Sequence, residues 1–283
     1  MHKLILCWLL GSITTIACTA QAPARLIIRG DDMGFSHSGN LALIKTYKEG
    51  ITRSIEVIVP SPWFPEAVKM LADNPQIDVG IHLALTSEWD NIKWRPITHC
   101  PSLTDSNGYF YPKIWPDASY PNGALLQHAW KLNEVEQELR AQIELGLKRI
   151  PRISHVSAHM GCTRMSPEVA ALAKKLAIEY KIDIDLDALG VKGVGFNGPH
   201  ATLAEKKKSF IAMLQSLKAG QTYMFLEHPG LNDAELQAIH HIGYEKVAED
   251  RQGVTDLWTD AEIKALIRKL NIQLISYKDL LAK

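Results

Sequence analysis

The sequence has few of the features that define several common classes of protein. Among its 283 residues are 4 cysteines, none in a Cys-x-x-Cys spacing, so a thiolate metal site is unsupported. The 31 basic and 31 acidic side chains balance, which gives no electrostatic reason to expect nucleic acid or a membrane surface as a partner. We find no internal repeat and no low-complexity tract. The apolar fraction of 46% instead predicts a folded chain with a substantial core, and one domain is the simplest arrangement.

The N-terminus, MHKLILCWLLGSITTIACTAQA, has the layout of a secretory signal. Lys3 precedes an apolar stretch, and Ala20-Gln21-Ala22 offers a cleavage site. The stretch is short for a membrane span and no stop-transfer segment follows, so a membrane anchor is the weaker alternative. We expect residues 1–22 to be a signal peptide and residues 23–283 to form the mature domain, exported to the periplasm or secreted. The residues around Cys18 also resemble a lipidation signal, which would anchor the exported protein through that thiol.

Apart from Cys18, the mature chain has two cysteines, Cys100 and Cys162. An exported protein meets an oxidising compartment, so a disulfide between them is one expectation. Two unpaired thiols fit the sequence equally well, because sequence alone gives no distance between them.

Short β-rich runs alternate with amphipathic helices from Arg25 onward. The runs are 25–29, 54–59, 78–83, 152–158, 182–187, 222–227 and 272–275. Helix starts are marked by Ser166 before a proline and by capping boxes at 202–205 and 259–262, and Gly220 is expected to end the second helix. This alternation predicts a single α/β domain with about seven parallel strands, closed as a barrel or open and doubly wound.

Residues 84–130 interrupt the alternation, because they have no sustained period before a predicted helix at about 134–149. A segment of this length is more often a functional insertion than a linker. It holds several tryptophans, of which we expect most to pack against the domain and one or two to line a cleft, where sugar rings can stack on them. The basic run Lys206-Lys207-Lys208 is interpreted as the solvated face of a helix.

Four of the predicted strands end in side chains that can do chemistry. These are Asp31 and Asp32 after the first, His82 in the third, His155 and His159 in and after the fourth, and His228 after the sixth. Each alone has an ordinary structural explanation, such as a turn or a core histidine. The carboxyl ends of strands in α/β folds are where active sites assemble, and carboxylate with imidazole suits a divalent ion such as zinc, magnesium or manganese.

Several stretches resemble the YdjC/ChbG carbohydrate deacetylase family, in the expected order. They are RGDDMGFSHSGNLAL, EGITRSIEVIVPSPWFPEAV, VGIHLALT, HVSAHMG, EHPG and LISYKDL, which together span about residues 25 to 281. The resemblance implies a distorted (β/α) barrel related to the NodB-type polysaccharide deacetylases. It also implies removal of N-acetyl groups from amino sugars, especially chitooligosaccharides.

The resemblance assigns roles to five residues. Asp32, His82 and His159 match the metal ligands of the family, with Mg²⁺ or Zn²⁺ as the ion. Asp31 matches the general base, and His228 the histidine that protonates the leaving amine.

Some positions depart from the family. Ser157 and Gly161 replace an Asp and a His near the fourth strand, and Met33 and Gly30 replace a Phe and an Ala around the Asp pair. Substrate contacts and the surroundings of the ligands are therefore in question. Two other functions remain open: a metal hydrolase acting on an ester, cyclic amide or phosphate, and a glycan-binding protein without catalysis. The sequence leaves the oligomeric state open and allows a homodimer.

Overall fold

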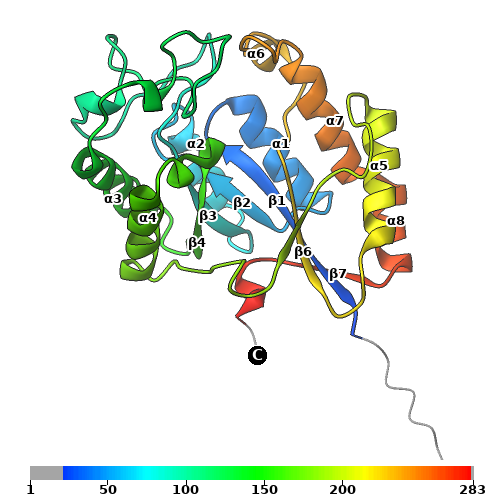
Figure 1. Ribbon diagram of the computed structural model, residues 1–283. Helices are drawn as coiled ribbons and strands as arrows, with labels where there is room; N and C mark the ends of the chain where they lie inside the picture. The colour runs from blue at the N-terminus through cyan, green and yellow to red at the C-terminus, as the bar shows by residue number, and fades with distance from the viewer. Residues whose placement is uncertain (1–21, 282–283) are drawn as a thin grey trace, which may run out of the picture.

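A curled sheet of seven parallel strands forms the centre of a single α/β domain in the computed structural model, which describes residues 22–281 (Figure 1). Every strand pairing is parallel, and the strand order is β4-β3-β2-β1-β6-β5, with β7 paired to β1. The strands are β1 (Ala24–Met33), β2 (Ser54–Val57), β3 (Asp78–Leu83), β4 (His155–Ala158), β5 (Lys192–Val194), β6 (Thr222–Glu227) and β7 (Ile272–Ile275). Because β4 and β5 end the order without pairing to each other, the sheet is an open half-barrel, which confirms the predicted distorted-barrel fold.

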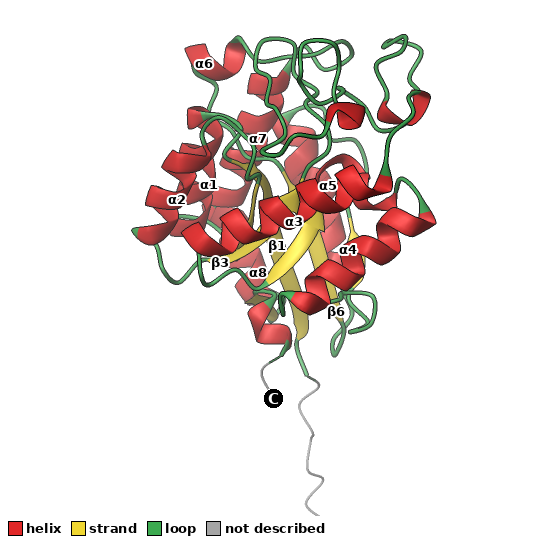
Figure 2. Ribbon diagram, turned by 90° about the vertical axis from the view of Figure 1, so that its left-hand side faces the viewer, coloured by secondary structure: helices red, strands yellow, loops and turns green. Residues whose placement is uncertain are grey.

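Helices pack around the sheet, and long loops gather beyond the carboxyl ends of the strands (Figure 2). The helices are α1 (His37–Lys48), α2 (Phe64–Ala72), α3 (Leu132–Arg149), α4 (Pro167–Glu179), α5 (Leu203–Ser216), α6 (Ala234–Gln237), α7 (Val247–Thr259) and α8 (Ala261–Lys269). Short 3₁₀ turns cover Pro101–Leu103, Leu125–Gln127, His159–Arg164 and Lys278–Leu280. Within the described residues, no helix combines the length and the apolar character that crossing a membrane requires.

Strand β1 is the central element. It pairs with β6 over 25–30, with β7 over 24–27 and with β2 over 29–33. Since a strand has only two edges, β7 and β2 share the edge opposite β6. Leu26, Ile27 and Ile28 are fully buried, as expected for a strand covered on both faces.

Two of the four predicted helix signals are confirmed, and the other two are corrected. The Ser166 side chain accepts a hydrogen bond from the Val169 amide at the start of α4, and the capping box at 202–205 begins α5. The cap of α8 is Asp260 and not Thr259, because the Asp260 carboxylate accepts from two amides of the first turn. Gly220 does not end α5: that helix stops at Ser216, and Gly220 lies in the following turn with φ 74°.

The strand predicted over 182–187 is wrong, and the fifth strand lies at Lys192–Val194. The alternation of apolar and acidic residues that suggested this strand is matched by their burial. Ile184 and Leu186 pack inward against Tyr277 and its neighbours, while the intervening aspartates are exposed. A strand also needs a hydrogen-bonded partner along its length, and here only Asp183 makes one isolated bridge, to His155.

The insertion at 84–130 is held to α3 by buried carboxylates. Glu138 accepts hydrogen bonds from the amides of Ile97 and Thr98, and Glu134 accepts one from Ser102. These bonds satisfy backbone groups of a segment that has little secondary structure of its own.

Two smaller expectations are also resolved, and a third concerns residues outside the described part of the chain. Lys206 is not solvated, because it is 2% exposed and its ammonium donates to Asp250 at 2.6 Å, so the basic run is not one solvated face. Cys100 and Cys162 are buried and unpaired, so they form no disulfide. Cys18 and the predicted signal peptide, except Ala22, lie outside the described residues.

Candidate active site

A bulge at the end of β1 brings two consecutive carboxylates to one place. Neighbouring residues in a regular strand point to opposite faces, but the pairing of β1 with β2 shifts register between Gly30 and Met33. Asp32 also adopts a left-handed conformation with φ 70°, which is uncommon for a residue other than glycine and concentrates at functional sites. Both carboxylates therefore approach the same histidine: His82 Nε2 lies 3.7 Å from Asp31 Oδ2 and 3.6 Å from Asp32 Oδ1.

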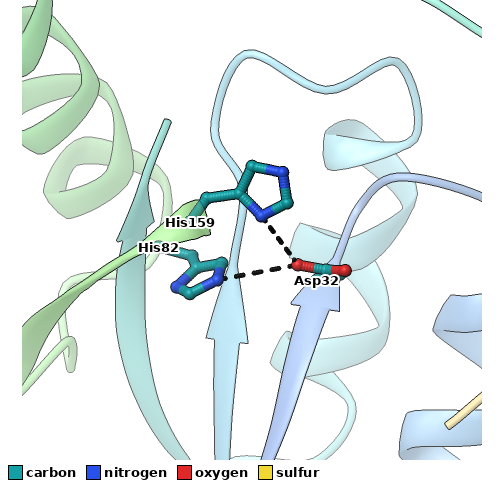
Figure 3. Close-up of side chains that lie close together, drawn as sticks. All are labelled: Asp32, His82 and His159. Carbon is teal, nitrogen blue, oxygen red and sulfur yellow. Dashed lines mark hydrogen bonds and ion pairs between the residues drawn. The ribbon is translucent and has the colours of Figure 1, made fainter. Parts of the chain in front are cut away.

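Asp32, His82 and His159 converge from three different strand ends (Figure 3). One potential ligand atom from each lies within 4.8 Å of the others, and all three side chains are buried. His82 stands in β3, and His159 begins the 3₁₀ turn after β4, where Met160 and Gly161 both have positive φ. His159 Nδ1 lies 3.1 Å from Asp32 Oδ1. The structure thus brings together the three residues that the family resemblance assigned as metal ligands.

Both histidines have their second ring nitrogen occupied by a protein group. His159 Nε2 is 3.0 Å from Glu88 Oε2, and His82 Nδ1 is 2.7 Å from the hydroxyl of Ser157, which stands where the resemblance expects Asp. Histidines that bind metal ions almost always use the second nitrogen in this way, which fixes the ring and its tautomer. One carboxylate and two oriented imidazoles are therefore a donor set that fits a divalent ion.

Asp31 is held by an arginine and is not free to rotate. Arg29 donates from Nε and Nη2 to the two Asp31 oxygens, both at 2.8 Å, and from Nη1 to the Tyr277 hydroxyl at 2.9 Å. The Arg29 and Asp31 side chains are 10% and 3% exposed. Burial alone would lower the pKa of Arg29, but Asp31 and Glu56 raise it well above its usual value, so Arg29 is a cation that donates two hydrogen bonds to the Asp31 carboxyl group.

The other oxygen of Asp32 faces an arginine and a histidine. Arg251, from α7, donates to Asp32 Oδ2 at 3.0 Å, and His228 Nε2 lies 3.8 Å from the same atom. Burial raises the pKa of Asp32, but His159, His228 and Arg251 outweigh it and hold this pKa well below its usual range. Desolvation lowers the pKa of His228, yet the charge of Asp32 and a side-chain hydrogen bond with Glu227 raise it above the ordinary value.

The two candidate ligand histidines have opposite pKa shifts. Burial lowers the pKa of His82 to about 4, with Asp31 opposing the shift, so His82 is neutral at pH 7. Burial also acts to lower the pKa of His159, but Glu88 and Asp32 raise it to about 10. A cation entering this site would therefore replace the proton on His159.

These groups line a cavity of about 410 Å³. Its walls include Trp89 and Tyr244, and Arg251 lies over the rings of Phe35 and Trp89 at 4.5 and 5.1 Å. The expectation that a tryptophan of the insertion lines the cleft holds for Trp89, which is itself buried. His155 does not reach this cavity, because it bonds to Glu56 at 2.6 Å and stacks on Tyr277.

The sequence did not point to four groups of this site: Arg29, Glu88, Arg251 and Tyr277. For Arg29 a signal was available, because residues two apart share one face of a strand and Arg29 precedes Asp31 by two. Glu88 lies in the aperiodic insertion and Arg251 in an ordinary helix far along the chain, so no local pattern marks either.

Proteins of known name or structure match most of the chain. A carbohydrate deacetylase of Brevibacillus brevis is 26% identical over 273 residues, covering 90% of this chain and 99% of the relative. A carbohydrate deacetylase of Thermus thermophilus is 30% identical over 238 residues, covering 76% of this chain and 80% of the relative. Among solved structures, a proposed cellobiose-phosphate cleavage protein of Enterococcus faecalis superposes with a TM-score of 0.71 at 23% identity, covering 92% and 99% of the two chains, which supports the fold.

The family model described as YdjC-like protein matches residues 25–269. That range starts at β1 and ends with α8, so it contains every residue described in this site except Tyr277. The chain therefore belongs to the YdjC-like family.

Proposed function

We propose that the protein is a metal-dependent carbohydrate deacetylase, which hydrolyses the N-acetyl groups of amino sugars in chitooligosaccharide-like glycans. The observation that carries the proposal is the convergence of Asp32, His82 and His159 beside Asp31, whose carboxyl group Arg29 orients. The relatives named carbohydrate deacetylase, matched over most of both chains, support the same substrate class.

The metal would be Zn²⁺ or Mg²⁺, held by Asp32, His82 and His159. Bound there, a divalent ion supplies Lewis acidity toward a water molecule and toward the amide carbonyl. The remaining steps fall to the side chains of this chain.

Asp31 is suited to act as the general base. It is not one of the three ligands, it lies 3.7 Å from His82 Nε2, and Arg29 fixes the orientation of its carboxylate. In this role it accepts a proton from the attacking water, as a positioned carboxylate can.

His228 is suited to act as the general acid. Its side chain is 34% exposed beside the cavity, and its raised pKa keeps a proton on the ring at a higher pH than usual. It would give this proton to the departing amine nitrogen, so that acetate and a free amino sugar leave. One proton is thus accepted by Asp31 and one is supplied by His228.

The alternatives differ in what they require of the site. A glycan-binding protein without catalysis needs neither a base nor an acid, whereas Asp31 and His228, which are suited to these two roles, lie beside the candidate ligands. A hydrolase for esters or cyclic amides could use the same groups, and the substrate decides between these and the proposed reaction.

The test is acetate release from N-acetylglucosamine oligomers. The purified protein is treated with a chelator and assayed before and after zinc, magnesium or manganese is restored, with His159→Ala as the control that should not recover. Metal-dependent release of acetate is expected. Stoichiometric metal binding with no release from any oligomer, but turnover of acetyl esters, would replace the proposed substrate class.

A further inference from the structure

Glu56 is a buried carboxylate that none of the roles above uses. It lies in β2 and is fully buried. Its Oε1 is 2.6 Å from His155 Nε2, and its Oε2 accepts the hydroxyl hydrogen of Ser157. Because a buried carboxylate is costly unless it is fully bonded, such a group needs a reason to be retained in the middle of a sheet.

The register of three neighbouring strands places Glu56 there. Glu56 pairs with Gly80, Gly80 pairs with His155, and two residues further His82 pairs with Ser157. Residues two apart in a strand share a face, so all five positions lie on one side of the sheet.

Gly80 leaves the space that the carboxylate occupies. A Cβ atom at this position would lie 2.3 Å from Glu56 Oε2 and 2.5 Å from His155 Nε2. A glycine inside a strand often marks such a close approach of other groups. Glu56 and His155 therefore meet above a position where a larger residue would force them apart.

The direction of the hydrogen bonds sets the tautomer of His82. The single hydrogen of the Ser157 hydroxyl is donated to Glu56, so Ser157 Oγ must accept from His82 Nδ1–H, at 2.7 Å. With the proton on Nδ1, the lone pair of Nε2 points toward Asp32 Oδ1, 3.6 Å away.

We propose that Glu56 is the positioning carboxylate for His82, acting through the hydroxyl of Ser157. The two candidate ligand histidines are then oriented in different ways. Glu88 contacts His159 directly, whereas Glu56 acts on His82 through the side chain of Ser157. The inference rests on the proposed function, because orienting His82 matters only when its Nε2 binds a metal ion.

Four variants, studied by two measurements, test this relay of Glu56, Ser157 and His82. Ser157→Ala removes the hydroxyl, Glu56→Gln removes the charge, and Gly80→Ala displaces the carboxylate without removing any polar group. Glu138→Gln is the matched control, since Glu138 is an equally buried carboxylate that bonds to the insertion and lies outside the cavity.

The first measurement is the tautomer of His82, from ¹H–¹⁵N NMR of histidine-labelled protein without metal. The wild type is expected to carry the proton on Nδ1, and Ser157→Ala to show a mixture of tautomers. The second is zinc affinity by competition with a chromogenic chelator, for which a loss of about 10- to 100-fold is expected in the first three variants. The control should bind zinc as the wild type does.

Ser157→Thr restores the hydroxyl and should restore both signals; Ser157 borders an open cavity that can take the added methyl group. If Glu56→Gln or Gly80→Ala fails to fold, Ser157→Ala, which removes one oxygen from a partly exposed position, still decides the question.

An Nε2 proton on His82 in the wild type, or unchanged zinc affinity in Ser157→Ala, would overturn the inference. An active deacetylase with unchanged affinity in Ser157→Ala would refute the relay alone. A protein that shows both expected effects but releases no acetate would refute the proposed substrate and leave the relay in place.

Discussion

Asp31→Asn separates the role of general base from that of metal ligand. The substitution keeps the shape of the side chain but removes the charge that accepts a proton. Loss of a general base typically lowers turnover by about 10²- to 10⁴-fold. Metal binding should be retained, because the three ligand candidates are Asp32, His82 and His159.

The same substitution has a cost in stability that the structure allows us to estimate. Asp31 accepts two hydrogen bonds from buried Arg29, and an amide can accept only one of them. Removing one partner of a buried ion pair costs about 3 to 5 kcal/mol. We expect the lower end, about 3 kcal/mol, because one bond persists and the Tyr277 hydroxyl still accepts from Arg29.

The assay measures acetate release per folded, metal-loaded molecule, with metal content determined by elemental analysis. Glu138→Gln serves as the control: it also neutralises a buried carboxylate, so it should lower stability while leaving turnover unchanged. Full activity in Asp31→Asn would show that Asp31 is not the base. Loss of metal together with activity would show that it is a ligand.

Three further predictions concern the metal site and the core. The raised pKa of His159 keeps its ring protonated at neutral pH, so metal binding should release one proton. The metal affinity should therefore increase about tenfold per pH unit between about pH 6 and 8. Chelator competition at several pH values measures the affinity, and an affinity that does not change with pH would contradict the prediction. Glu88→Gln should weaken metal affinity by about 10- to 100-fold. It should also make the affinity depend less steeply on pH, since Glu88 is the group that raises the pKa of His159 most. An unchanged affinity would show that Glu88 does not support the metal site. Lys206→Met should lower the free energy of unfolding by about 3 kcal/mol, because it leaves Asp250 without its ammonium partner. Lys207→Met on the same helix is the control and should cost less than about 1 kcal/mol. Urea unfolding compares the two variants, and equal losses would show that the burial of Lys206 is unimportant.

The sequence by itself determined where the candidate site residues lie along the chain. Apolar runs placed most of the strands, and the ends of those runs carried Asp32, His82 and His159. These signals are local, because a strand that is buried on both faces must be apolar and its polar residues then fall at its ends. The helix caps at Ser166 and Thr202 were readable for the same reason: each acts on an amide within a few residues.

Only the tertiary structure decided which polar groups meet. His155 and His159 occur in one short motif, yet strand register sends His155 to Glu56 while the turn after β4 sends His159 to Asp32. Arg251 reaches Asp32 across 219 residues of sequence. Prediction from local sequence fails in the same way for the segment 182–187. Its alternation of apolar and acidic residues predicted which side chains face inward, but not whether a neighbouring strand would pair with it. Strand pairing and the contacts that Arg251 and Glu88 make in the site join groups far apart in the sequence, which meet only when the sheet curls, so no local pattern could specify them.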